Sequence, residues 1–279
     1  MYNTRIAPSP TGDFHLGTAR TAYFNWLAAR ATGGKFILRV DDTDSERNVS
    51  GAADVIYDCM DWLGLDFDDD FTQSARLDRY HEVAMSLVTQ GFATVADNGA
   101  VLLNWDVPTT WTDAMAGVMV ANDNDRKLYN NQVLLKGNGM PIYHFATVVD
   151  DIDSNINYVI RGADHFTNTH RHAAIYDALG ATKPLFAHVG LIMVDKKKMS
   201  KRDKAASLLG YRDSGYSPEA VRSTLLRLGW GPTVDNKSTK FIDKDRAVTM
   251  FVTGGKMKAN PATLDIGKLD YFKRIYKSA

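Results

Sequence analysis

Two segments of the chain combine residue types that suit the handling of a nucleoside triphosphate. The first, residues 7–17, is a turn rich in proline and glycine that leads to His15 and Gly17. The second, residues 195–202, is a lysine-rich loop that contains Lys201. An imidazole at a helix N-terminus can bind phosphate oxygens, and positioned ammonium groups stabilise the charge that builds on a transferring phosphoryl group. The pair therefore indicates a site for the phosphates of a nucleotide such as ATP.

Alternating strand and helix patterns would position the first segment. We expect a strand ending at Ile6-Ala7, helices over 16–31, 51–63 and 78–90, and a strand over 35–40. Gly33-Gly34 predicts a left-handed stop for the first helix, and the run Asp41–Asp44 can cap the second. Gly17 would let the backbone approach a nucleotide without a Cβ in the way. This βαβ order predicts a parallel sheet whose ligand binds beyond the carboxyl ends of the strands.

The pattern changes after residue 92 and divides the chain into four predicted parts. Residues 93–130 alternate in short segments, which indicates a small β-rich insertion. We then expect strands over 132–135, 157–161 and 189–193, with helices over 144–150 and 168–179 between them. Beyond the lysine loop, Ser217-Pro218-Glu219 begins a helix that runs to Leu228. The predicted parts are 1–92, 93–130, 131–205 and 206–279.

Composition limits the class of protein. The 279 residues hold 33 basic and 33 acidic side chains, so any nucleic acid would bind to local patches. Cys59 is the single cysteine, which excludes a disulfide framework and a multi-cysteine zinc site and fits a reducing cytosol. No apolar stretch follows a basic cluster at the N-terminus, and no run of about 18 apolar residues occurs. The sequence predicts a cytoplasmic protein that contacts no membrane, with Cys59 buried on a helix.

Several segments in order along nearly the whole chain resemble glutamyl-tRNA synthetases, which are class I aminoacyl-tRNA synthetases. The residues around His15 and Gly17 resemble the HIGH element, and Lys198–Arg202 resembles the KMSKR loop. The other matching segments are Thr4–Gly12, Gln73-Ser74-x-Arg76, Val148–Asp151, Val159–Gly162 and Tyr211–Ala220. The resemblance implies a Rossmann-like, doubly wound parallel sheet with a small β-rich insertion and a C-terminal helical subdomain. It also implies a monomer that activates L-glutamate with ATP and Mg²⁺ as glutamyl-adenylate. The glutamate would then be transferred to the 3′ end of a tRNA, whose acceptor stem the protein would contact.

The resemblance assigns roles to residues of this chain. His15, Gly17 and Lys201 would be catalytic. ATP would be bound by Pro8, Ser9, Thr11, Gly12, His15, Gly17, Asp164, Lys198, Met199, Ser200, Lys201 and Arg202, with His165 nearby. Glutamate would be bound by Arg5, Ala7, Ser9, Asp41 through its α-amino group, Tyr143 through its side chain, and Arg161 through its γ-carboxylate. A planar guanidinium pairs a carboxylate with two parallel hydrogen bonds, so Arg161 favours glutamate over glutamine.

The chain departs from the family in three places. It has Asp41 where the family has glutamate, which puts the ammonium contact and amino-acid choice in question. The insertion at 93–130 is short and has no cysteine cluster, so we expect no zinc and a reduced grip on the tRNA acceptor end. The sequence stops after Leu264–Tyr271, where the family continues into an anticodon-binding domain; either the sequence is truncated or the natural protein does not read an anticodon.

Two other functions remain open from the sequence. A glutamyl-queuosine tRNA synthetase also lacks an anticodon domain and attaches glutamate to a modified base, but it carries a cysteine-rich zinc segment. A catalytically idle paralogue that binds tRNA is the third possibility, although it gives no reason to keep His15, Gly17 and Lys201 together. His170 and His172 point apart on a helix, and no third ligand is obvious, so we expect no metal there.

Replacement of Lys201 by alanine tests the lysine loop. We expect adenylation to slow by orders of magnitude while the melting temperature stays the same, because a loop lysine buries little surface. ATP–pyrophosphate exchange and a thermal melt measure the two quantities. An unchanged exchange rate would remove Lys201 from the mechanism.

Overall fold

A computed structural model describes residues 1–12, 14–194, 197–198, 207–231, 233–234, 237–238, 242–253 and 257–277 of the chain. The strands are β1 (Thr4–Ile6), β2 (Phe36–Val40), β3 (Asp69–Thr72), β4 (Ala93–Val95), β5 (Val101–Leu103), β6 (Thr110–Asp113), β7 (Gly117–Val120), β8 (Val133–Leu135), β9 (Tyr158–Gly162), β10 (Leu185–Val189), β11 (Ile192–Val194), β12 (Lys197–Lys198), β13 (Thr233–Val234), β14 (Lys237–Ser238) and β15 (Ala262–Thr263). The helices are α1 (Leu16–Thr32), α2 (Ala52–Trp62), α3 (Leu77–Thr89), α4 (Asp123–Tyr129), α5 (Tyr143–Asp153), α6 (Asn168–Ala178), α7 (Leu208–Asp213), α8 (Pro218–Arg227), α9 (Lys244–Thr253) and α10 (Ile266–Lys277), with short 3₁₀ turns at Gln73–Arg76 and Ala163–His165.

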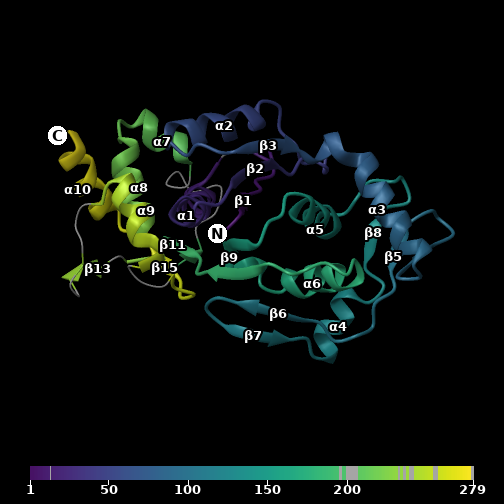
Figure 1. The fold of residues 1–279 in the computed structure, drawn as a ribbon. Coiled ribbons are helices and arrows are strands. Elements are labelled where there is room, and N and C mark those ends of the chain that lie inside the picture. The colour runs from purple at the N-terminus through teal and green to yellow at the C-terminus, as the bar shows by residue number, and fades with distance from the viewer. Residues whose placement is uncertain are drawn as a thin grey trace.

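Two parallel sheets lie side by side at the centre of the molecule (Figure 1). In the first, β2 pairs in parallel with β1 and β3; in the second, β10 pairs in parallel with β9 and β6. The sheets meet where the carbonyl of Asn3 accepts hydrogen bonds from the N–H groups of Asn157 and Tyr158, at 3.1 and 3.2 Å. The strand order across the pair is therefore β3-β2-β1-β9-β10, and the predicted α/β fold class with parallel strands is confirmed.

Helix α1 joins the two sheets to the helices behind them. Its residues from Ala19 to Ala29 are all buried, because α1 packs against β1 and β9 on one side and against α8 and α9 on the other. The helix ends at Gly33, whose φ of 69° is the left-handed stop expected from the sequence. Asn25, at its centre, donates a hydrogen bond to the Ile160 carbonyl at 2.9 Å. The backbone N–H of Ile160 returns one to the Asn25 side-chain oxygen at 3.4 Å.

The 93–130 segment contributes strands to two different sheets. Strands β4 and β5 form a small sheet with β8, and β6 pairs in parallel with β10, with Asp113 opposite Phe186. Figure 1 shows the β6–β7 hairpin along the outer edge of the β9–β10 sheet. The insertion is β-rich as predicted, with the added helix α4. It also extends the β9–β10 sheet, a long-range pairing that the local sequence pattern does not reveal.

Two expectations about local structure were wrong. No side chain of the Asp41–Asp44 run caps α2, because its N-cap is Gly51, which has a φ of 76° and makes no side-chain cap bond. The strand expected over 189–193 is divided into β10 and β11, and β10 begins four residues earlier than predicted, at Leu185. The break falls at Gly190, whose N–H donates to the Lys258 carbonyl at 3.1 Å.

The C-terminal part is helical, as predicted. Helix α8 begins at Pro218 after the N-cap Ser217, whose hydroxyl accepts from the Ala220 N–H, and α10 packs against it. Figure 1 places α8, α9 and α10 together at one end of the molecule. Cys59 is fully buried on α2. Within the described ranges, none of the helices combines the length and apolar character that crossing a bilayer requires.

Replacement of Gly190 by alanine tests the contact between β10 and the C-terminal part of the chain. An added Cβ would lie 2.0 Å from the Asn260 carbonyl oxygen and 2.3 Å from its carbon, and the backbone must move to admit it. We expect the free energy of unfolding to fall by roughly 3 kcal/mol, the upper range for overpacking. Urea unfolding measures the change. Gly210→Ala is the control, since its nearest neighbour would lie 3.6 Å away; equal stability of the two variants would contradict the steric account.

Candidate active site

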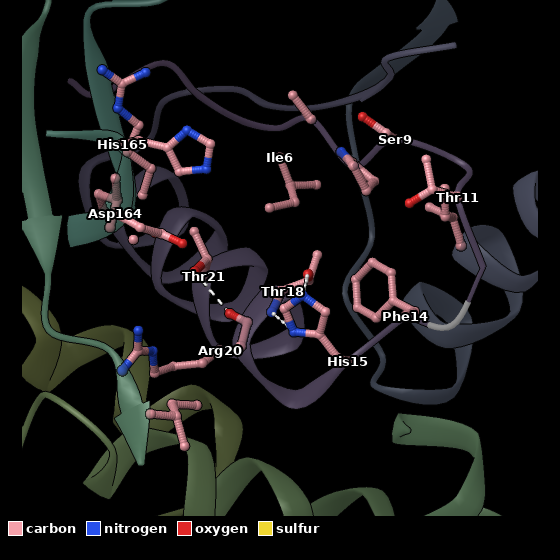
Figure 2. A pocket seen from close by; sticks show the side chains of 18 of the residues that line it. Ile6, Ser9, Thr11, Phe14, His15, Thr18, Arg20, Thr21, Asp164 and His165 are labelled. Atoms are coloured by element: carbon pink, nitrogen blue, oxygen red, sulfur yellow. Dashed lines mark hydrogen bonds between the residues drawn. The ribbon is translucent and has the colours of Figure 1, made fainter. Parts of the chain in front are cut away.

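A cavity of about 340 Å³ opens between the two sheets, at the carboxyl ends of β1 and β9. It falls in the size range of small-molecule sites and lies where the strand order of the two sheets changes, as expected for an open parallel sheet. Eleven of the residues expected from the sequence line it: Arg5, Ala7, Pro8, Ser9, Thr11, Gly12, His15, Gly17, Tyr143, Arg161 and Asp164. Figure 2 shows Ser9, Thr11 and Phe14 on one side of the cavity, with Asp164 and His165 across from them.

His15 caps the helix that forms the floor of the cavity. Its Nδ1 accepts a hydrogen bond from the Thr18 N–H at 3.2 Å, which also fixes Nδ1 as the unprotonated nitrogen. The proton of the neutral ring is therefore on Nε2, which lies 3.2 Å from the Thr18 hydroxyl (Figure 2). An Nε2–H group at a helix N-terminus is a donor suited to a phosphate oxygen.

Gly17 is needed for the position of that imidazole. A Cβ at residue 17 would lie 3.0 Å from both Cε1 and Nδ1 of His15, closer than ordinary carbon contacts. The role of Gly17 thus includes leaving room for a neighbouring side chain as well as for a ligand. The backbone next to His15 is also bound to the C-terminal part of the chain, since the N–H of Leu208 donates to the Phe14 carbonyl at 3.0 Å.

Arg161, one residue before the end of β9, is a buried cation with no adjacent anion among the residues that the structure describes. Its side chain is 5 % exposed and lines the cavity. Its three hydrogen bonds reach His188 Nε2 at 3.1 Å, His172 Nδ1 at 3.3 Å and the Thr169 hydroxyl at 2.7 Å. Among the described residues, no carboxylate lies within ion-pair distance of it, and burial lowers the pKa of its guanidinium. A buried charge of this kind is stabilised by an anionic ligand.

The histidines around Arg161 are held in the neutral form. Burial lowers the pKa of His172 well below its usual value and that of His144 to about 4. Because Arg161 donates to His172 Nδ1, the proton of His172 is on Nε2, which faces His144 Nδ1 at 3.1 Å. His170 and His172 face different partners, since His170 Nδ1 lies 3.4 Å from the indole nitrogen of Trp111.

Arg39 contrasts with Arg161, because carboxylates surround it. It donates to Asp41 and Asp151 at 2.7 Å each, and Asp150 lies 3.6 Å away. Asp151 also pairs with Arg5 at 3.2 Å. Burial raises the pKa of Asp41 to about 6, against the lowering effect of Arg39. Asp41 is not among the residues that line the cavity, because its carboxylate is turned toward Arg39.

The lysine loop lies largely outside the described residues. Lys198 is part of β12, which pairs with β11 beside the cavity residue Ile192. Met199, Ser200, Lys201 and Arg202 fall outside the described ranges.

Further lining residues come from α1 and from the loop after β2. Thr18, Arg20 and Thr21 line the cavity together with Arg47. Arg20 donates to the Leu228 carbonyl at 2.7 Å, and burial lowers its pKa to about 10 although Asp164 opposes the shift. Helical periodicity could have identified two of these residues from the sequence. Arg20 and Thr21 follow Gly17 by three and four positions and therefore lie on the same face of the helix.

Comparison with known proteins places the chain among tRNA synthetases. A family model for the catalytic domain of class I tRNA synthetases (E and Q) matches residues 1–100 and 101–270. The glutamate–tRNA ligase of Nitrosospira multiformis is 37% identical over 99% of this chain and 66% of its own length. That of Akkermansia muciniphila is 41% identical over 85% of this chain and 57% of its own. The chain thus spans about two thirds or less of the length of these relatives.

Solved structures agree with the sequence comparison. A glutamate tRNA ligase from Elizabethkingia meningosepticum, in complex with its amino acid, superposes with a TM-score of 0.87 at 26% identity. The match covers 99% of this chain and 70% of that one. A structure described as a putative arginyl-tRNA synthetase from Campylobacter jejuni shares the fold alone, with a TM-score of 0.57 at 13% identity.

The buried histidines predict a loss of stability in mild acid. His144 titrates near its ordinary 6.5 when unfolded and at about 4 when folded, so only the unfolded chain binds a proton there between these values. Stability is therefore lost as the pH falls through this window, by about 2 kcal/mol at pH 5 for this residue. Urea unfolding of His144→Gln should show a smaller difference between pH 7 and pH 5. The exposed His81, replaced in the same way, is the control, and equal pH dependence of both variants would refute the assignment.

Proposed function

This chain belongs to the class I tRNA synthetase family (E and Q), and we propose that it activates L-glutamate with ATP and transfers it to the 3′ end of a tRNA. The single observation that carries the choice of amino acid is Arg161, a buried guanidinium in the cavity wall whose described partners are an alcohol and two neutral imidazoles. A side-chain carboxylate would supply the missing anion. The amide of glutamine carries no charge and cannot do so.

The proposed reaction has two steps. A carboxylate oxygen of glutamate attacks the α-phosphorus of ATP, the bond to pyrophosphate breaks, and glutamyl-adenylate forms. A terminal ribose hydroxyl of the tRNA then attacks the carbonyl carbon, loses its proton and releases AMP. In this proposal His15 Nε2–H and the N-terminus of α1 bind phosphate oxygens, supported by the capping position of His15 at the start of the helix. Lys198, Met199, Ser200, Lys201 and Arg202 complete the proposed ATP site.

The proposed glutamate contacts are Arg5, Ala7, Ser9, Tyr143 and Arg161, all of which line the cavity. Asp41 is left out of this set because its buried carboxylate is already bonded to Arg39 at 2.7 Å. Mg²⁺ would enter on the phosphates of ATP, since Asp164 is the sole carboxylate among the described lining residues. We further propose that the protein is a cytoplasmic monomer that engages the acceptor end of its tRNA.

ATP–pyrophosphate exchange tests the proposal. The assay compares glutamate, glutamine and aspartate, each with and without total tRNA. Exchange with glutamate that requires tRNA supports the ligase, whereas exchange without tRNA favours the enzyme that modifies queuosine. No exchange under any condition removes both activities and leaves a binding paralogue.

Replacement of Arg161 by glutamine tests the carboxylate receptor. Loss of one partner of a buried charge pair weakens binding strongly, so we expect kcat/KM for glutamate to fall by about two orders of magnitude or more. The KM for ATP should stay near the wild-type value. Arg79→Gln, at a side chain that is 41 % exposed, is the control and should exchange normally. Unchanged discrimination between glutamate and glutamine in Arg161→Gln would contradict the assignment.

A further inference from the structure

Asp113 lies at the end of β6, in the inserted segment, and its carboxylate is buried. Its Oδ1 accepts hydrogen bonds from the backbone N–H groups of Met115 and Ala116, at 2.8 and 2.9 Å. Its Oδ2 lies 2.7 Å from Nδ1 of His188, on β10. One oxygen is thus fixed by the turn between β6 and β7, and the other is directed at an imidazole.

This contact determines where the proton of His188 resides. Burial opposes ionisation of Asp113, but the hydrogen bonds from His188 and the two backbone groups lower the pKa of the carboxyl below its usual value. An ionised carboxylate only accepts hydrogen bonds, so His188 Nδ1 must donate. Burial lowers the pKa of His188 and keeps the ring neutral. Its Nε2 is therefore left as an acceptor, and it receives the Nε–H of Arg161 at 3.1 Å.

A direct ion pair between Asp113 and Arg161 would both orient the guanidinium and neutralise its charge. The imidazole of His188 between them separates these two effects. Asp113 orients Arg161 through His188 without lying against the guanidinium and neutralising it. The positive charge of Arg161 remains available to the cavity. The Thr169 hydroxyl, 3.1 Å from His188 Nε2 and 2.7 Å from Arg161 Nη2, fixes the same geometry from α6.

We propose that Asp113 is a positioning residue that, through His188, orients Arg161 for the carboxylate of the amino-acid side chain, so that the β6–β7 hairpin takes part in amino-acid selection. This inference rests on the proposed function, which supplies the substrate. The inserted segment would therefore contribute to recognition of the amino acid, in addition to any contribution to tRNA binding.

Asp113→Asn tests the tautomer. The backbone donors of Met115 and Ala116 require the amide oxygen at the Oδ1 position, which directs the amide NH₂ at His188 Nδ1. That nitrogen must then accept, Nε2 gains the proton, and the Nε–H of Arg161 loses its acceptor. We expect the KM for glutamate to rise by about 10-fold to 100-fold, the same size of effect as when a partner that orients a metal-binding histidine is changed. The preference for glutamate over glutamine should fall, with kcat and the KM for ATP near wild type.

Asp125→Asn is the matched control. Asp125 belongs to the same inserted segment and lies 3.8 Å from a different histidine, His170, whose ring faces Trp111. Its replacement should leave the KM for glutamate unchanged. His188→Gln provides a second test, because a glutamine amide oxygen can accept from Arg161 whatever residue 113 is. In that background Asp113→Asn should change the KM much less than it does alone.

The outcomes separate this inference from the proposed function. Wild-type protein that shows no glutamate-dependent exchange defeats the proposed function and the role in amino-acid selection with it. In that case ¹⁵N NMR of His188 still decides whether Asp113 fixes the tautomer that faces Arg161. The spectrum should report an Nδ1–H ring in the wild type and an Nε2–H ring in Asp113→Asn. An active wild type whose Asp113→Asn variant keeps the same KM and the same preference overturns the inference alone. A uniform loss of kcat, ATP affinity and melting temperature would also overturn it, as the sign of a purely structural ion pair.

Discussion

Asn25 makes the bridge on which the site depends, with its backbone bonded to one strand and its side chain to the other. Strands β1 and β9 share no ladder along their length. The side-chain amide of Asn25 exchanges hydrogen bonds with the backbone of Ile160, and the Asn25 backbone carbonyl accepts one from the Thr4 hydroxyl at 2.8 Å. One buried residue of α1 thereby fixes both strands. The cavity lies beyond the point at Asn3 where the two sheets meet, and Arg5 and Arg161 enter it from different sheets.

Two buried arginines show how similar positions serve different purposes. Arg39 ends β2 among three carboxylates, and its charge is compensated within the fold. Arg161, near the end of β9, has neutral acceptors, and no carboxylate in the described part of the chain pairs with its charge. Burial of an unpaired cation costs on the order of several kcal/mol of folding free energy, and an anionic ligand that pairs with the cation offsets this penalty. The partners of each arginine, more than its depth, distinguish a structural cation from a binding one.

Local signals account for what the sequence predicted well. The run from Leu16, with its left-handed stop at Gly33, and the start of α8 at Ser217-Pro218 are set by residues close in the chain. The pairing of β6 with β10 and the division at Gly190 depend on contacts far along the chain, which periodicity does not record. Sequence reasoning missed His188 for the same cause, since its role depends on contacts with residues distant in the chain. One contact is with Asp113, 75 positions earlier, and the other is with Arg161.

The close approach of Gly190 to Asn260 bears on the order in which the protein can fold during synthesis. Strand β11 pairs with β15 only after the ribosome has made residues 262 and 263, about 70 residues after β11 itself. Until then the edge of β11 has no partner there, and exposed strand edges favour pairing with other chains. The nascent chain therefore passes through an interval in which the half of the cavity formed by β1 and β9 can be assembled while the wall beside Ile192 is still open.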